Sequence, residues 1–180
     1  MSKNRYISFL LLVCTLVVCS SFSGDPIREK LKKVYSAEIG VREKTGKNDG
    51  VRVEQYLKYV ALTKGNPWCA SFVCWGYGQV GVKNPKSGYC PDLFTSKYII
   101  YKRTGAPNKA PPQSGDIFGI YFPEKKRIAH TGFVDEWGSK YVITVEGNTN
   151  EAGSREGDGV YKKRRLINSI YAVANYIDKK

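Results

Sequence analysis

One cysteine in this 180-residue chain stands where a helix is expected to begin. It is Cys69, in the stretch NPWCASFVCWGYGQVGV at residues 66–82, which is apolar almost throughout. Asn66 is a favoured N-cap and Pro67 a favoured first helical residue, so the pattern predicts Cys69 at the third helical position. Free N–H groups and the positive dipole end of a first turn lower the pKa of a thiol. Cys69 is therefore a candidate nucleophile, although a buried thiol can also be ordinary apolar packing.

His130 is the only histidine in the sequence, so any imidazole base has to be this residue. Residue polarity alternates as in strands over two stretches near it, 127–134 and 141–146. A hairpin with a three-residue loop at 137–139 would place His130 directly opposite Glu146, with Asn148 on the same face. A carboxylate on one ring nitrogen fixes the tautomer and leaves the other nitrogen to take a proton. The alternative is an ordinary sheet histidine, with Glu146 and Asn148 as turn residues.

The elements that would position these side chains begin with helices. A first helix is expected to begin at Asp25-Pro26, which suit the N-cap and first helical positions. Its apolar face would consist of Ile27, Leu31 and Val34. A second helix is expected to end before Lys64-Gly65, with an apolar face of Val53, Tyr56, Leu57 and Val60. A third helix is predicted from Asn66 to about Val80, and a weaker pattern predicts a fourth over 91–103.

Short runs rich in Ile, Val, Tyr and Phe then follow, and they predict strands at 116–122, 127–134, 141–146, 159–166 and 170–177. Helices followed by a meander of strands indicate an α+β fold. We expect the N-terminal helices to pack on a curved antiparallel sheet of about five to six strands. The tyrosines of these strands are expected to pack within the sheet, and stacking on sugars is the alternative for some of them.

Residues 1–23 have the pattern of a secretory signal peptide, with a basic start, an apolar stretch at 7–19 and small residues before Gly24. The stretch is shorter than the ~20 residues of a membrane span. We expect cleavage after Ser23, export to the periplasm, the cell envelope or the medium, and one domain over residues 24–180. The alternatives are an uncleaved anchor and a lipoprotein attached at Cys19, the one case in which a membrane would be a partner.

Composition limits the partners and the redox chemistry. The chain has 29 Lys and Arg against 16 Asp and Glu, a net charge of +13, which favours anionic partners or simply aids solubility. Export disfavours nucleic acid among these partners and leaves cell-wall polymers. Beyond the signal peptide three cysteines remain, an odd number, so one thiol is left over in any intramolecular pairing. Cys74 is expected in the core, and a disulfide between Cys74 and Cys90 is possible.

Four stretches occur in the order WCASFVCW, PPQSGDIFGI, AHTGFV and VEGN, at residues 68–75, 111–120, 129–134 and 145–148. In this order they resemble the CHAP-type cysteine amidases and peptidases of bacterial cell walls. Two further stretches, IGVREKTGKNDGVRVEQYL and REGDGVYKKRR, resemble the same family, so the likeness covers most of the predicted domain. The related NlpC-type family is a poorer match, because it usually has a second histidine in the third catalytic position.

The resemblance implies a papain-like α+β fold and assigns roles to four residues. Cys69 would be the nucleophile, with its backbone N–H among the oxyanion donors, and His130 would be the base. Glu146 would orient the imidazole, and Asn148 would assist it or polarise the site. Trp68, beside the nucleophile, is a candidate substrate-binding residue.

The expected function is therefore hydrolysis of an amide bond in peptidoglycan through an acyl-cysteine intermediate, by a monomer without metal or cofactor. The bond would join muramic acid to L-Ala, or lie within the peptide stem or cross-bridge. A non-catalytic wall-binding module is the first alternative, and the joint presence of Cys69, His130, Glu146 and Asn148 disfavours it. An antibacterial amidase effector is the second alternative, and the predicted signal peptide disfavours it.

Overall fold

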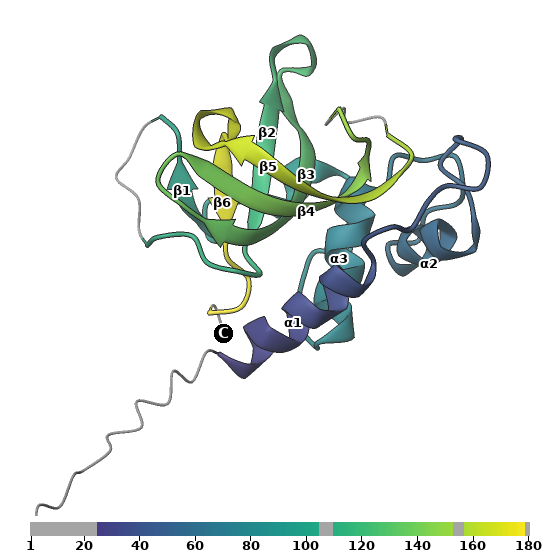
Figure 1. The fold of residues 1–180 in the computed structure, drawn as a ribbon, viewed down its shortest axis with the longest axis horizontal. Coiled ribbons are helices and arrows are strands. Elements are labelled where there is room, and N and C mark those ends of the chain that lie inside the picture. Colours follow the sequence, from purple (N-terminus) through teal and green to yellow (C-terminus); the bar gives the residue numbers. More distant parts are fainter. Residues whose placement is uncertain (1–24, 105–109, 153–156, 179–180) are drawn as a thin grey trace, which may run out of the picture.

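The structure is a computed structural model, which describes residues 25–104, 110–152 and 157–178 (Figure 1). The predicted signal peptide at 1–23 and the alternative lipid site at Cys19 lie outside the described residues. Three helices precede a six-stranded sheet, so the predicted α+β class is confirmed. None of the helices in the described ranges is both long and apolar enough to cross a membrane.

The helices are α1 (Pro26–Ala37), α2 (Val51–Tyr59) and α3 (Cys69–Gln79). Asp25 caps α1 as predicted, because its side chain accepts a hydrogen bond from the Ile27 N–H at 2.8 Å. The buried face of α1 differs from the prediction, since it consists of Arg28, Leu31 and Tyr35 while Ile27 is 39% exposed. Arg28 can be buried because its guanidinium binds the carboxylates of Asp116 and Asp178, at 3.0 and 2.9 Å.

The strands are β1 (Ile99–Lys102), β2 (Ile117–Phe122), β3 (Arg127–Trp137), β4 (Tyr141–Thr149), β5 (Gly159–Leu166) and β6 (Ala172–Ala174). They form one antiparallel sheet in the order β1-β6-β2-β3-β4-β5. The sheet curves, and the helices lie together beside it (Figure 1). Five of the six strands lie where the sequence predicts them.

The predicted helix over 91–103 is wrong. The chain forms a short 3-10 helix, η1 (Cys90–Leu93), and then strand β1. The pair Ile99-Ile100 is β-branched, and pairing with β6 along the sheet edge outweighs the weak helical pattern. Two further 3-10 turns, η2 (Pro123–Lys125) and η3 (Ile167–Ser169), connect strands.

Helix α3 is the centre of the core. It packs against β3 and β4, and α1 and α2 also pack against α3. Gly147 on β4 permits this close approach, because a Cβ there would lie 2.6 Å from the Trp68 ring and 2.9 Å from the Phe72 Cβ. The first turn of α3 is therefore held directly against the strand that carries Glu146.

Candidate active site

Cys69 is the first residue of α3 and is 5% exposed. The prediction that Asn66 caps this helix and that Cys69 is its third residue is wrong. The Asn66 amide instead donates to the Thr63 carbonyl, and the Trp68 N–H donates to Oδ1 of Asn148 at 2.9 Å. A side chain from β4 thus satisfies the helix start, and Cys69 still lies in the first turn where N–H groups stabilise a thiolate.

His130 and Glu146 are in contact, as the sequence predicts. His130 Nε2 lies 2.8 Å from Oε2 of Glu146, and both side chains are almost completely buried. The predicted hairpin register is wrong, because Phe133 pairs with Val145 and a bulge interrupts the ladder between Val134 and Glu136. The register is displaced by two residues, which keeps both side chains on one face, and long side chains bridge such a diagonal offset.

Glu146 is held by two groups besides the imidazole. Arg165 on β5 binds the carboxylate with two bonds, Nε to Oε1 at 2.5 Å and an Nη2 donor to Oε2 at 2.6 Å. The Thr144 hydroxyl donates to Oε1 at 2.5 Å. Burial would raise the pKa of Glu146, but Arg165 and His130 outweigh it and lower that pKa to about 2. Glu146 is therefore an anion across the physiological pH range.

The other ring nitrogen of His130, Nδ1, lies on the side of the ring away from the nitrogen that binds the carboxylate. It is buried and makes no regular hydrogen bond within the described part of the chain, although ring and thiol shift each other's pKa. Burial would lower the pKa of His130, but the interactions with Cys69 and Glu146 raise it to about 9. The site thus favours an imidazolium beside the thiol.

Cys90, the first residue of η1, is a close neighbour of Cys69. The two Sγ atoms lie 3.5 Å apart, and both residues are buried. Hydrogen bonding from Cys90 is the largest cause that lowers the pKa of Cys69 well below its usual value; burial opposes it, and the imidazolium of His130 adds to it. The possible disulfide between Cys74 and Cys90 is not present, since Cys90 faces Cys69 and the Cys74 thiol donates to the Ser87 carbonyl.

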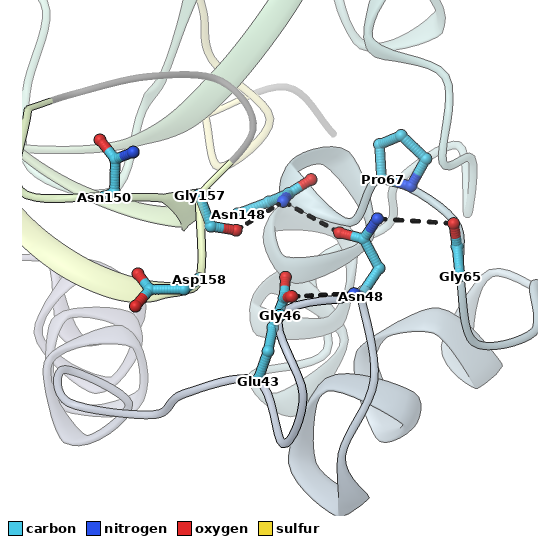
Figure 2. A pocket seen from close by; sticks show the side chains of 9 residues that line it. All are labelled: Glu43, Gly46, Asn48, Gly65, Pro67, Asn148, Asn150, Gly157 and Asp158. Carbon is cyan, nitrogen blue, oxygen red and sulfur yellow. Dashed lines mark hydrogen bonds between the residues drawn. The ribbon is translucent and has the colours of Figure 1, made fainter.

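The Asn148 side chain contacts the start of α3, and its expected role in assisting the imidazole or polarising the site stays a prediction. Its side chain caps α3 and donates to Oδ1 of Asn48 and to the Gly157 carbonyl, each at 3.1 Å, and none of its described bonds reaches His130 (Figure 2). The reason is local, because Asn148 has a φ of 54°, which turns its side chain toward the helix start. Asn148 is therefore a positioning residue for Cys69.

Trp68 is fully buried, so the expectation that it binds substrate is wrong for this structure. Its ring stacks on Tyr56, and its Nε1 donates to Oε1 of Glu43 at 2.8 Å. Glu43 lines a cavity of about 470 Å³ together with Pro67 and Asn148, which Figure 2 shows. The packing and the hydrogen bond of the Trp68 side chain hold the backbone just before Cys69 in place.

A second cavity, of about 480 Å³, gives access to the thiol. Cys69 and Cys90 lie in its wall, and its rim carries two cations, Lys86 and Arg127, beside Tyr89. The Arg127 guanidinium lies 4.8 Å from the centre of the Tyr89 ring. In the part of the chain that the structure describes, no three His, Cys, Asp or Glu side chains gather as a metal ion would require.

Sequence reasoning missed Arg165, Thr144 and Cys90 as members of the site. The strand that carries Arg165 was predicted, but its run of four basic residues gives no sign of which cation turns inward. Cys90 lies 21 residues from Cys69, beyond any local pattern. Its proximity depends on how the loop after α3 returns to the helix start.

Comparison with models of known families, with curated proteins and with solved structures finds no match for this chain. The chemistry of the site has to be judged from its own geometry. A thiol at a helix start, an imidazole that helps to lower its pKa and a buried carboxylate that fixes the ring are groups that nucleophilic acyl transfer can use.

Proposed function

We propose that this protein is a cysteine hydrolase that cleaves an amide bond of bacterial peptidoglycan through an acyl-cysteine intermediate. The observation that carries the catalytic part is that the Glu146 carboxylate holds His130 through Nε2 at 2.8 Å, while His130 contributes to lowering the pKa of the Cys69 thiol. This arrangement supplies a thiolate and an acid in the same pair, which is what acyl transfer needs.

In the first step the Cys69 thiolate attacks the amide carbonyl, and the N–H groups of the first turn of α3 stabilise the negative charge on oxygen. His130 gives its Nδ1 proton to the leaving amine, and a thioester on Cys69 results. Nδ1 then takes a proton from water as the water attacks the thioester, which releases the carboxylic acid and restores the Cys69 thiolate beside the His130 imidazolium. Glu146 stays ionised throughout and stabilises the imidazolium, as its low pKa favours.

The substrate class is supported by the surroundings of the thiol and by the sequence resemblance. The thiol opens into a cavity with two cationic side chains at its rim, Lys86 and Arg127, and the whole chain has a net charge of +13. Peptide stems of peptidoglycan carry free carboxylates, which such a rim attracts. The motifs around Cys69, His130 and Glu146 resemble wall amidases of the CHAP type. We infer an exported monomer that acts in the cell envelope.

Digestion of purified sacculi tests this proposal. Wild-type protein is expected to release soluble fragments, and mass spectrometry of these fragments identifies the bond from the new amine and carboxylate ends. A Cys69→Ala protein, shown to be folded by circular dichroism, is the control and should release none. Intact sacculi after prolonged incubation with reduced wild-type protein would reject peptidoglycan as the substrate.

A further inference from the structure

The pair formed by Cys69 and Cys90 has a chemistry that hydrolysis does not use. Their sulfur atoms lie 3.5 Å apart, and both residues line the same cavity of about 480 Å³, so a small molecule that reaches one sulfur also reaches the other. The third cysteine of the described residues, Cys74, is fully buried in the middle of α3 and does not line the cavity that Cys69 and Cys90 share.

We propose that Cys69 and Cys90 are the site of a reversible disulfide, which blocks the nucleophile when it forms and restores it when it is reduced. The effect on activity rests on the proposed function, whereas the disulfide itself does not. The oxidant is a small-molecule disulfide, and the reductant is a small-molecule thiol.

The geometry requires little movement. A disulfide has a sulfur–sulfur distance of about 2.05 Å, so the two atoms have to approach by roughly 1.5 Å. Cys69 is fixed by the buried helix and by the Asn148 cap, whereas Cys90 begins a four-residue 3-10 helix after a loop. That loop contains Gly88 and reaches η1 through the exposed residue Tyr89. The displacement therefore falls on the side of Cys90.

The reaction balances in two exchanges. The Cys69 thiolate attacks one sulfur of the small disulfide, forms a mixed disulfide and releases one small thiolate. Cys90 then loses its proton and attacks the Cys69 sulfur, which forms the protein disulfide and releases the second small thiolate. The protein loses two hydrogens and two electrons, and the small disulfide gains them as two thiols. Cys69 is suited to the first attack, because thiolates rather than thiols react.

Cys74 provides an internal comparison for this chemistry. Burial raises its pKa to about 11, and its thiol donates to the Ser87 carbonyl. Cys74 is therefore a poor nucleophile, and its burial keeps reagents from reaching it. The two-thiol reaction should involve the other two cysteines and leave Cys74 reduced.

The experiment treats wild-type protein with bis(2-hydroxyethyl) disulfide, traps remaining thiols with an alkylating reagent and maps peptides by mass spectrometry. We expect a peptide pair joined through Cys69 and Cys90, Cys74 alkylated only after denaturation, and a loss of hydrolysis of about 100-fold or more, because an oxidised sulfur is no nucleophile. Dithiothreitol should restore both thiols and the activity.

Two variants separate the steps. Cys90→Ser lacks the second thiol, so the mixed disulfide on Cys69 should persist and carry one hydroxyethylthio group. Cys74→Ser should behave as the wild type. A wild-type protein that stops at the mixed disulfide with Cys90 alkylated, or that joins Cys74 to Cys90, would overturn the proposal. Reduced protein that cleaves no sacculi would reject the proposed function, while the peptide map would still decide the disulfide.

Discussion

Two cysteines on helix α3 have similar burial and opposite acidity. Cys69, at the first residue, has a pKa well below its usual value, with Cys90 as the largest cause and His130 as a further one. Cys74, five residues later, has a pKa raised to about 11 because burial dominates there. Burial opposes the thiolate in both places. At Cys69 the effect of burial on the pKa is outweighed by Cys90 from η1 and His130 from β3, which lie at the helix start.

The difference shows how one element can hold both a structural and a reactive thiol. The middle of α3 is buried, and the Cys74 thiol there meets the Ser87 carbonyl, whereas the helix start meets the Asn148 side chain, the imidazole and a second thiol. The low pKa of Cys69 therefore depends on the contacts between the start of α3 and the neighbouring residues of β3, β4 and η1. Changes to these contacts should alter Cys69 and leave Cys74 as it is.

Removing each thiol should produce the largest contrast. Cys69→Ala is expected to abolish hydrolysis, because the nucleophile is gone, while Cys74→Ala should keep most of the activity. In the wild type, Cys69 should react with iodoacetamide well below pH 8, and Cys74 only on unfolding. Peptide mapping of alkylated protein across a pH series measures this. Equal alkylation of the two cysteines at neutral pH would contradict the comparison.

Glu146→Gln should raise the pKa of Cys69 and so bring it closer to the raised pKa of Cys74. Loss of the carboxylate lowers the pKa of His130 from about 9, and less imidazolium raises the pKa of Cys69. The pH profile of kcat/KM should therefore narrow from both sides, with the basic limb moving down and the acidic limb moving up. We expect kcat to fall roughly 10²- to 10⁴-fold, the range for groups that serve a general acid–base.

Glu146→Gln removes the carboxylate charge that Arg165 binds, so folding has to be checked by circular dichroism and by thermal unfolding. Thr144→Val is the matched control, because it removes one hydrogen bond to the same carboxylate and keeps its charge. Its pH limbs should stay close to those of the wild type. An unchanged basic limb in a folded Glu146→Gln protein would show that the carboxylate does not govern the imidazole.

The helix start can be tested without touching any titrating group. Asn148→Ala removes the acceptor for the Trp68 N–H and places alanine at a φ of 54°, so the free energy of unfolding should fall by about 1–3 kcal/mol. Asn66→Ala, at the position that the sequence favours as the cap, should cost less, because the Asn66 side chain makes only an exposed bond to Thr63. Urea denaturation of the two variants measures the difference. A larger loss of unfolding free energy in Asn66→Ala than in Asn148→Ala would mean that Asn66 caps the helix, as the sequence pattern predicts.

These residues also show what sequence can and cannot reveal here. The contact between His130 and Glu146 could be predicted, because strand alternation fixes which face of the sheet each side chain lies on. The alternation survives a displacement of the register by two residues, so the contact between His130 and Glu146 was predicted correctly from a wrong register. Asn66, by contrast, matches a local cap preference that a more distant residue, Asn148, overrides in three dimensions.

Partners contributed by distant loops and strands could not be predicted. Arg165 is one of several basic residues in its strand, and only the curvature of the sheet and the pairing of β4 with β5 direct it to Glu146. Cys90 depends in the same way on the path of a loop. Local patterns thus predict the chemical groups of the site, while the groups that set their pKa values come from tertiary structure.

The smallest expected effect concerns access to the thiol, which Cys69 has and Cys74 lacks. Arg127 lines the cavity of Cys69 and packs over the Tyr89 ring. Since its charge is partly exposed, a substrate carboxylate at the rim should gain only about 0.2–1 kcal/mol from it. Arg127→Ala should therefore raise KM for a carboxylate-bearing stem peptide by about two- to fivefold and leave kcat unchanged, the pattern of a binding contact kept from ground state to transition state.

Lys125→Ala is the matched control, because Lys125 is an exposed cation in η2, two residues before Arg127, and does not line the cavity. Its KM should equal that of the wild type, and an amidated stem peptide should remove the difference between Arg127→Ala and the wild type. High salt should also reduce it, since exposed charges are screened. An equal rise in KM for both variants would mean that overall basic charge, rather than the rim of this cavity, draws the substrate to Cys69.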